Sequence, residues 1–190
     1  MMQISFLPSV NYLKECFELD PASPSYLKWN KDRPISHFAS AESHKIWKVK
    51  AANKQITNLS TDGYYIVYTH TINNKVTRFK AHRIIYAIAN NTNDFQNLQI
   101  DHIDCNKLNN NPQNLRLATN TQNQYNKGKQ KNNTSGHKNI HFHKKCQKYT
   151  CSITVNKKQI HLGVFETLES AIETRDKKIK EIAKEFFRTT

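Results

Sequence analysis

Hydrophobic and polar positions alternate in three segments near the C-terminal end of the chain. The segments are KNIHFHK, KYTCSITV and KQIHLGVF, and short polar stretches separate them. Alternation with a period of two is typical of strands that bury one face against a core. The pattern therefore predicts three antiparallel strands, joined by hairpin turns at residues 144–147 and 156–157.

A helical pattern follows these strands. From about Leu168 to Phe187, apolar residues recur at spacings of three and four, which predicts one apolar helix face. The acidic residues come early in this helix and most lysines come later, as the helix dipole favours. One sheet face can pack on the helix and leave the other face free. The predicted apolar face consists of Ala171, Ile172, Ile179, Ile182, Ala183 and Phe186.

The middle of the chain predicts a hairpin and another helix. The apolar runs YYIVYTH and KVTRF flank Asn73-Asn74, a pair typical of a tight turn between two strands. Residues 81–91 place their apolar side chains on one helical face, which predicts a helix packed behind a sheet. Before the hairpin, mixed short strands and turns are expected, including a strand in SYLKWN at residues 25–30.

Residues 98–127 predict the order strand, loop, strand and short helix. LQIDHI is the first strand, an asparagine-rich loop with Pro112 follows, and NLRLAT is the returning strand. Thr119 is a natural N-cap for the helix NTQNQYNK, and Gly128 is a natural end for it.

These elements together predict an α+β protein with two domains. The first domain covers residues 1–127, with a β-rich part up to residue 80 and the strand–loop–strand–helix core from residue 81. Residues 128–136, GKQKNNTSG, have the composition of a linker. The second domain, at residues 137–190, is a three-stranded antiparallel sheet packed on one helix.

The charge of the chain indicates its partner. Lys and Arg number 29 and Asp and Glu number 15, which gives a formal net charge of +14. Between Cys105 and Phe165 there is no acidic residue, although lysines recur throughout this segment. A merely solvated surface mixes both signs, so charge of one sign indicates binding to a phosphate backbone.

Cysteine usage and the N-terminus indicate the compartment. Cys16, Cys105, Cys146 and Cys151 include no Cys-x-x-Cys pair, and the first residues lack the pattern of a signal peptide. An intracellular, cytoplasmic protein of a bacterial or virus-infected cell is therefore expected. No apolar run approaches the roughly 18 residues of a membrane span, so no membrane partner is expected.

Four polar residues of the asparagine-rich stretch fit the chemistry of phosphodiester hydrolysis. A neutral histidine is a suitable base near pH 7, so His102 is the candidate base and Asn114 its brace. Carboxylate and amide oxygens suit Mg²⁺ or Mn²⁺, so Asp101 and Asn123 are the candidate ligands of one divalent ion. The remaining loop asparagines are expected to build turns; they are Asn106, Asn109, Asn110 and Asn111.

The order of these residues resembles the HNH endonuclease family. The motif consists of Asp101-His102, then Asn114 followed by Leu-Arg, then Asn123, and it resembles the variant with Asn in the third position. The segments DGYYIVY, AHR and IDHIDCNKLNNNPQNLRLAT are similar to phage-type homing endonucleases of this family. The resemblance implies a ββα-metal fold in which His102 activates water and Asn114 orients the imidazole of His102. It also implies that Asp101 and Asn123 hold the metal.

One departure from the family pattern bears on this region. Cys105 stands where the family usually has glycine, so a positive φ at this position would strain the loop.

The C-terminal segment NNTSGHKNIHFHKKCQKYTCSITVNKKQIHLGVFETLESAIETRD resembles the DNA-binding domain of plant ethylene-response factors (AP-two type). In that family a three-stranded sheet enters the major groove and the helix packs behind it. This chain departs from the pattern of that family, since Tyr149 replaces a usual Trp and Thr174-Arg175 replaces a usual Ala-Tyr. Candidate DNA-binding residues of this chain are Arg116, Lys138, His141, His143, Lys145, Lys148, Thr150, Ser152 and Lys157.

Zinc is the alternative for the C-terminal domain. His141, His143, Cys146 and Cys151 have the ligand types that zinc prefers, but they lack the usual spacing of ligand pairs, so zinc is not expected.

The sequence therefore predicts a metal-dependent endonuclease that nicks or cuts double-stranded DNA. A phage or mobile-element homing enzyme is expected, acting as a monomer, with a dimer as the other possibility. The alternative function is a catalytically inactive DNA-binding or regulatory protein, in which the C-terminal domain would do the same work.

Overall fold

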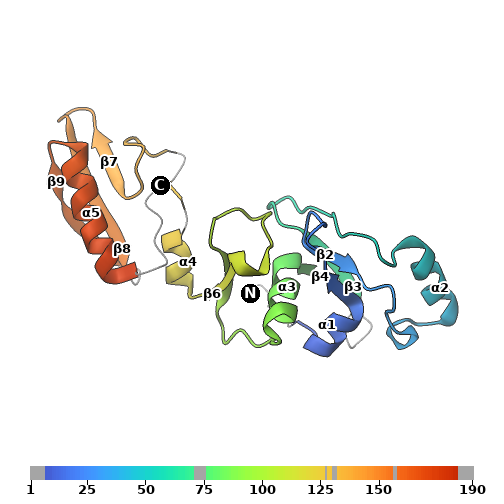
Figure 1. The fold of residues 1–190 in the computed structure, drawn as a ribbon. Helices are drawn as coiled ribbons and strands as arrows, with labels where there is room; N and C mark the ends of the chain where they lie inside the picture. The colour runs from blue at the N-terminus through green and yellow to red at the C-terminus, as the bar shows by residue number, and fades with distance from the viewer. Residues whose placement is uncertain (1–6, 71–75, 127, 130–131, 156–157, 184–190) are drawn as a thin grey trace. The chain divides into compact units, whose positions relative to one another are not determined.

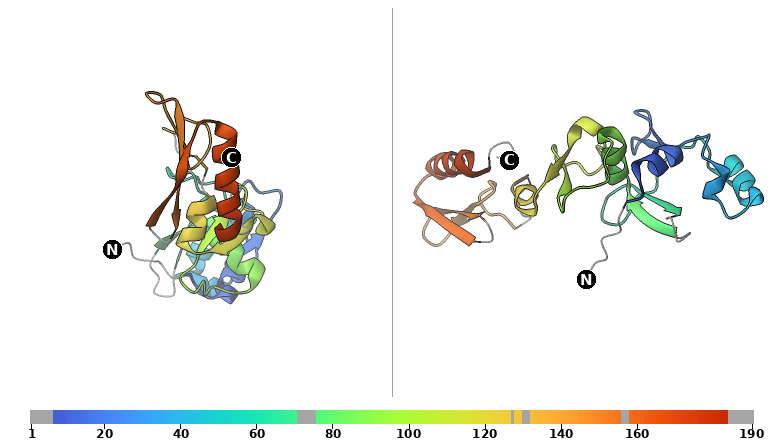
Figure 2. Two further views of the ribbon diagram at one scale, coloured as in Figure 1. Left: turned by 90° about the vertical axis from the view of Figure 1, so that its left-hand side faces the viewer. Right: turned by 90° about the horizontal axis from the view of Figure 1, so that it is seen from below.

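The computed structural model describes residues 7–70, 76–126, 128–129, 132–155 and 158–183 (Figure 1). Small antiparallel sheets and short helices make up the fold, which confirms the α+β class (Figures 1 and 2). By its contacts the chain divides into two compact units, Met1–Leu117 and Ala118–Thr190. Among the described helices, none combines the length and the apolar character needed to cross a membrane.

The first unit begins with a helix that the sequence did not predict. Helix α1 (Val10–Cys16) starts at Ser9, whose side chain accepts a hydrogen bond from the backbone of Tyr12. It leads into β1 (Phe17–Leu19), which pairs antiparallel with β2 (Leu27–Trp29). The strand expected in SYLKWN is thus confirmed at β2, and the side-chain cap explains why so short a helix forms.

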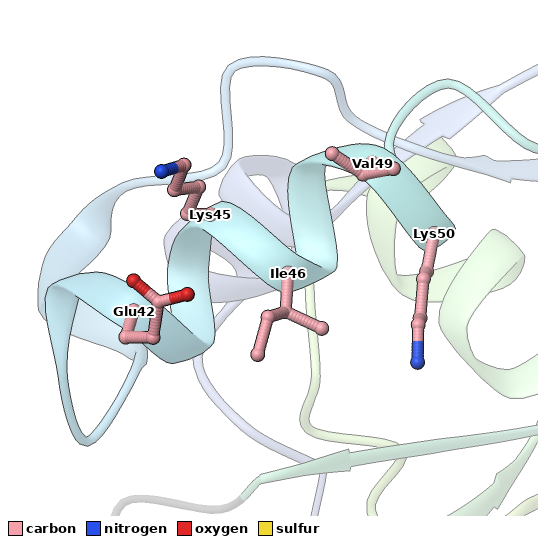
Figure 3. A pocket seen from close by; sticks show the side chains of 5 residues that line it. All are labelled: Glu42, Lys45, Ile46, Val49 and Lys50. Atoms are coloured by element: carbon pink, nitrogen blue, oxygen red, sulfur yellow. The ribbon is translucent and has the colours of Figure 1, made fainter.

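Helix α2 (Ala41–Lys50) is a second unpredicted element, preceded by a 3₁₀ turn at Ile35–His37. A reciprocal capping box between Ser40 and Ser43 starts it. Trp47 packs edge-on against Trp29, with 6.0 Å between the ring centroids. Apolar periodicity could not reveal α2, because Trp47 is among its few apolar contacts and none of its residues is fully buried. Figure 3 shows a shallow pocket on α2, lined by Glu42, Lys45, Ile46, Val49 and Lys50.

The predicted hairpin and the helix after it are confirmed. Strands β3 (Ile66–His70) and β4 (Val76–Lys80) pair antiparallel in one register. The turn expected at Asn73-Asn74 lies outside the described residues. Helix α3 (Ala81–Asn90) follows β4 directly.

The core of the first unit gathers around α3. Its buried residues Ala81, Ile84 and Ile85 belong to this core, as the apolar pattern predicted. Leu115, the first residue of the returning strand, belongs to it as well, so the core holds that strand in place. Other members are Leu7, Leu13, Cys16, Phe17, Leu27, Ile56, Val67, Phe79, Ala87 and Phe95.

The asparagine-rich stretch has the predicted order of elements. Strand β5 (Gln99–His102) is followed by the loop, a 3₁₀ turn (Pro112–Asn114) and β6 (Leu115–Ala118), which is the neighbour of β5 in a two-stranded sheet. Helix α4 (Asn120–Asn126) comes next. Thr119 caps α4 as expected, because its hydroxyl accepts from the backbone of Gln122 at 3.2 Å.

The second unit contains the three predicted strands. Strands β7 (Ile140–His143), β8 (Lys148–Val155) and β9 (Lys158–Phe165) form an antiparallel sheet in that order. Helix α5 (Leu168–Ala183) lies along this sheet in Figure 1. The predicted turn at 156–157 and the part of the helix prediction beyond residue 183 lie outside the described residues.

By contacts, the division between the two units comes before α4. The domain boundary that the sequence predicted after α4 stays a prediction. Within the second unit, a hydrogen bond from Lys138 Nζ to the carbonyl oxygen of Gln124, at 3.2 Å, joins α4 to the residues leading into β7.

Arg175, one of the departures from the resemblance, is a structural residue. Its side chain is only 1% exposed and lies on α5. Its guanidinium is 2.8 Å from a carboxylate oxygen of Asp176 and donates to the carbonyl oxygen of Lys138 at 3.1 Å. Arg175 therefore anchors the start of the sheet to α5.

Candidate active site

His102, the candidate base, lies at the end of β5 and is buried. Its Nε2 is 3.0 Å from Oδ1 of Asn110, a loop residue that is itself only 2% exposed. The amide nitrogen of Asn110 donates to the carbonyl oxygen of Ser25 at 3.1 Å. The imidazole is thus held by a loop residue that is anchored to the N-terminal part of the same unit.

These two hydrogen bonds determine which nitrogen of His102 carries the hydrogen. The carbonyl oxygen of Ser25 can only accept, so the NH₂ group of Asn110 faces it and Oδ1 faces the imidazole. Because Oδ1 also can only accept, Nε2 of His102 must be the donor. In the neutral ring the lone pair is then on Nδ1, which is the atom that can take a proton from water.

Asn114, the predicted brace, lies at the end of the 3₁₀ turn and holds the loop together. Its Oδ1 accepts from the backbone N of Asp104 at 3.1 Å, and its Nδ2 donates to Oδ1 of Asp104 at 2.9 Å and to the carbonyl oxygen of Asn109 at 2.8 Å. Its own carbonyl oxygen accepts from Ile103 N at 2.9 Å. Its orienting role at His102 stays a prediction, and these bonds act on the backbone that directly follows His102.

The loop is built around the carboxylate of Asp104. This group accepts hydrogen bonds from Asn106 N at 2.8 Å, from Asn109 Nδ2 at 2.7 Å and from Asn114 Nδ2 at 2.9 Å. Burial raises the pKa of Asp104, but the hydrogen bonds from Asn109, Asn114 and Asn106 outweigh burial, so its pKa lies below the ordinary value. The carboxylate is therefore ionised at neutral pH, and Asn106 and Asn109 form the loop as expected.

Cys105 has the positive φ at which a glycine is favoured. Its φ is 62°, and its backbone N donates to the carbonyl oxygen of His102 at 2.9 Å. A side chain in this left-handed region costs roughly 1–2 kcal/mol compared with glycine. The strain that the sequence suggested for this position is thus a property of the turn directly after the candidate base.

Replacing Cys105 with glycine should raise the free energy of unfolding by about 1 kcal/mol, because glycine removes the penalty of a positive φ. Urea unfolding of both proteins measures the difference. The control is Cys146→Gly, in the exposed turn of residues 144–147, where the described φ values show no such strain at Cys146. A gain of similar size at both positions, or none at Cys105, would contradict the strain.

Asp101, the predicted metal ligand, is paired with Arg116 on the neighbouring strand. Nε of Arg116 donates to Oδ2 of Asp101 at 3.0 Å. The side chain of Asp101 is 6% exposed and that of Arg116 is 17% exposed, so the pair is mostly buried. Arg116 was expected to contact DNA, and the structure gives it this carboxylate as a partner within the protein.

Aromatic and imidazole rings line another side of His102. His82 on α3 is buried, and its ring centroid lies 5.1 Å from that of His102. Tyr64 lies 5.1 Å from His82 and 6.1 Å from His102. Burial, and then electrostatic interactions with His102, Lys80 and Arg83, hold the pKa of His82 well below its usual value. His82 is therefore a neutral imidazole that packs beside the ring of the candidate base, His102.

Asn110 and His82 were not among the catalytic and metal-binding residues that the sequence predicted. Asn110 was taken as a turn former because it stands among similar asparagines, and only its contact with a residue 85 positions away distinguishes it. His82 belongs to the AHR segment, which did carry a signal because it was one of the segments similar to the endonucleases.

Asn123, the second predicted ligand, belongs to the second unit. It lies on α4, where its backbone N donates to the carbonyl oxygen of Thr119 at 2.9 Å. The helical position predicted for it is thus confirmed, while its role as a ligand stays a prediction.

The sheet of the second unit places most of the predicted DNA-binding residues on one face. His141 is opposite Thr150, and His143 is opposite Lys148. The alternating residues Ile140 and Cys151 instead pack on Ala171 of α5. The face turned away from α5 therefore carries His141, His143, Lys148, Thr150 and Ser152, and also the exposed His161, which is opposite Ser152 and was not predicted.

The other candidates lie elsewhere. Lys145 is in the exposed turn between β7 and β8, Lys138 precedes β7, and Lys157 lies outside the described residues. The four residues considered for zinc do not share one face, because Cys151 points to the side of α5 and the two histidines to the other. In the described part of the chain, no group of three or more His, Cys, Asp or Glu residues is placed to hold a metal ion.

Comparison with known proteins identifies the middle of the chain. Residues 79–125 match the family described as HNH endonuclease. The chain thus carries an HNH endonuclease domain at these residues, and the domain contains Asp101, His102, Asn114 and Asn123. No curated protein and no solved structure matches the chain. The match does not reach residues 137–190, so the resemblance of that segment to the ethylene-response factors stays a prediction.

Proposed function

We propose that the protein is a DNA endonuclease that hydrolyses a phosphodiester bond of double-stranded DNA with His102 as the general base. The observation that carries the proposal is the fixed imidazole inside the HNH endonuclease segment. Asn110 holds Nε2 of His102, and this leaves the lone pair of the neutral ring on Nδ1.

In the proposed reaction, Nδ1 of His102 takes a proton from a water molecule whose oxygen attacks phosphorus. The bond between phosphorus and the 3′ oxygen breaks, which yields a 5′-phosphate and, after protonation, a 3′-hydroxyl. Nε2 carries its hydrogen before and after the transfer, so the hydrogen bond to Asn110 is kept throughout. A brace that needs no rearrangement during the reaction is the kind of preorganisation that favours catalysis.

We propose further that β5, β6 and α4 form a ββα-metal core that holds one Mg²⁺ or Mn²⁺ ion. Asp101, which pairs with Arg116 through Oδ2, is its proposed carboxylate ligand, and Asn123 is the second ligand by its place in the motif. Carboxylate and amide oxygens fit such an ion, which keeps several waters and needs few protein ligands. The ion would neutralise charge on the phosphoryl oxygens and the leaving oxygen.

The resemblance to phage-type enzymes supports a homing endonuclease that nicks one strand per binding event as a monomer. The basic residues of the second unit support a role in holding DNA, because its sheet leaves one face uncovered by α5. Affinity for DNA should therefore fall steeply with salt, as counterions are released from the phosphates on binding.

One observation favours the alternative, an inactive DNA-binding or regulatory protein. The mostly buried guanidinium of Arg116 already neutralises the carboxylate that a metal ion would need. In an inactive protein this ion pair would be the stable arrangement of the site, and the second unit would still bind DNA.

Conversion of supercoiled plasmid to open circles distinguishes the two functions. We expect wild-type protein to nick the plasmid with Mg²⁺ or Mn²⁺ and to leave it intact with EDTA, because hydrolysis needs the metal to stabilise the charge of the transition state. Binding of the plasmid without nicking in either metal would contradict the enzyme and support the inactive DNA-binding protein.

A further inference from the structure

Two lysines from separate segments meet on one aromatic ring beside His102. Nζ of Lys80, at the end of β4, lies 3.6 Å from the centroid of the Tyr64 ring. Nζ of Lys107, in the loop after β5, lies 4.8 Å from the same centroid. The Tyr64 ring is 6.1 Å from the ring of His102. Two ammonium groups are thus brought close to the candidate base.

The turn at Asp62 and Gly63 explains why the lysines converge. Nζ of Lys80 is 2.7 Å from Oδ2 of Asp62, and Nζ of Lys107 donates to the carbonyl oxygen of Asp62 at 3.0 Å. Gly63 has a φ of 79°, the left-handed conformation that glycine adopts readily, so this turn can form between the two lysines.

The cluster keeps a net positive charge. The hydrogen bond from Lys80, helped by one from Ser60, lowers the pKa of Asp62 to about 2, so this carboxylate is ionised at neutral pH. Two ammonium groups therefore face one carboxylate. The side chains of Lys80 and Asp62 are 35% and 53% exposed, so their ion pair is accessible to solvent and to a competing anion.

The chemistry of the cluster suits a phosphate group and not a nucleic-acid base. Lys80 and Lys107 both lie over the Tyr64 ring, so the ring surface that they cover is not open for a nucleic-acid base to stack on. Burial, and then the carboxylates of Asp62 and Asp101, raise the pKa of Tyr64, so its hydroxyl stays protonated and can donate. Two ammonium groups and one hydroxyl donor suit the oxygens of a phosphate.

We propose that Lys80, Lys107 and Tyr64 form a subsite for a backbone phosphate of the substrate strand next to the bond that is cut. The subsite rests on the proposed function, because only the reaction at His102 makes one phosphate of the strand special. In the protein without DNA, Asp62 occupies the place of this phosphate on Lys80. Binding of the strand exchanges that carboxylate for a phosphate oxygen.

The test compares Lys80→Gln and Lys107→Gln with a matched control, Lys28→Gln. Lys28 also pairs with a carboxylate, that of Glu18 at 3.1 Å, and it lies in the same unit on β2. At saturating plasmid with Mg²⁺, each subsite variant should lower kcat for nicking about tenfold, the value of one charge-assisted hydrogen bond. KM should rise no more than severalfold, because most of the affinity for DNA comes from other lysines. The control should nick as the wild type does.

Binding to a fluorescein-labelled duplex in EDTA gives a readout that does not need nicking. The slope of log affinity against log salt should fall by about one for each subsite variant, as expected when one phosphate contact is lost. Lys80→Arg should keep the wild-type slope, which separates loss of charge from misfolding. Asp62→Asn should have the opposite effect and tighten binding severalfold at low salt, because it removes the competing carboxylate.

These experiments give one set of results if the phosphate subsite is wrong and a different set if the proposed endonuclease function is wrong. If the wild type nicks and both lysine variants behave as Lys28→Gln does, in nicking and in salt slope, the subsite is wrong and the enzyme stands. If the wild type never nicks, the reaction is wrong, and the place of the subsite beside a cut bond falls with it. Wild-type affinity for Asp62→Asn would overturn the exchange of carboxylate for phosphate.

Discussion

Replacing His102 with alanine should lower the rate of metal-dependent plasmid nicking by about 10²–10⁴-fold, the usual contribution of a general base. Alanine leaves Asn110 and Ser25 in place but removes the nitrogen that accepts the proton from water. Initial rates of open-circle formation with Mg²⁺ measure the loss. Affinity for a labelled duplex in EDTA should stay close to that of the wild type, because the substitution removes no positive side chain.

Asn110→Ala provides a graded comparison for this experiment. The base remains in this variant, but Nε2 of His102 loses its acceptor and the ring can turn or shift its hydrogen. Misplacement of a catalytic group by about 1 Å costs on the order of 10²-fold, so the loss should be smaller than for His102→Ala. Nicking at the wild-type rate by His102→Ala would rule out His102 as the base, and nicking at that rate by Asn110→Ala would rule out the brace.

Elements with strong hydrophobic periodicity were predictable from the sequence. Strands β3, β4, β7, β8 and β9 and helices α3 and α5 all bury one face, and each lies where its apolar pattern placed it. Helices α1 and α2 were missed for the opposite reason. They are stabilised by side-chain caps at Ser9 and Ser40 and by contacts such as that between Trp29 and Trp47. Such interactions do not produce a regular spacing of apolar residues in the sequence.

The candidate site could be predicted for those residues whose order along the chain determines which of them lie close together. Asp101 and His102 lie on β5, and Asn114 lies directly before β6, because two antiparallel strands joined by a loop bring their ends together. The choice among loop asparagines was not predictable. Asn109 is exposed and Asn110 is buried, although they are adjacent, and the difference comes from the distant carbonyl of Ser25.

The pairing of Arg116 with Asp101 was also not predictable from the sequence. A lysine or arginine in a basic segment is expected to contact phosphate, and the sequence gives no sign that its neighbour across β5 and β6 is Asp101. This ion pair bears on both proposed functions. In the endonuclease the carboxylate of Asp101 would bind a metal ion, whereas in the inactive DNA-binding protein it would stay paired with the guanidinium of Arg116.

Replacing Arg116 with glutamine should therefore lower the free energy of unfolding in EDTA by about 3 kcal/mol, because it removes the cation paired with a mostly buried carboxylate. If Asp101 holds a metal ion, millimolar Mg²⁺ should restore part of that loss by taking the place of the guanidinium. Binding to the folded state alone raises stability with ligand concentration, so the gain on adding Mg²⁺ should be larger for the variant than for the wild type. Urea unfolding with Mg²⁺ and with EDTA measures both effects.

The control for this experiment is Arg78→Gln on β4, which removes the same charge from an exposed position. Its stability should change by no more than about 0.5 kcal/mol, and Mg²⁺ should affect it as it affects the wild type. A large loss for Arg116→Gln that Mg²⁺ leaves unchanged would show that Asp101 needs the guanidinium and takes no metal ion in its place. The carboxylate would then be structural, and the inactive DNA-binding protein would account for the ion pair better than the enzyme does.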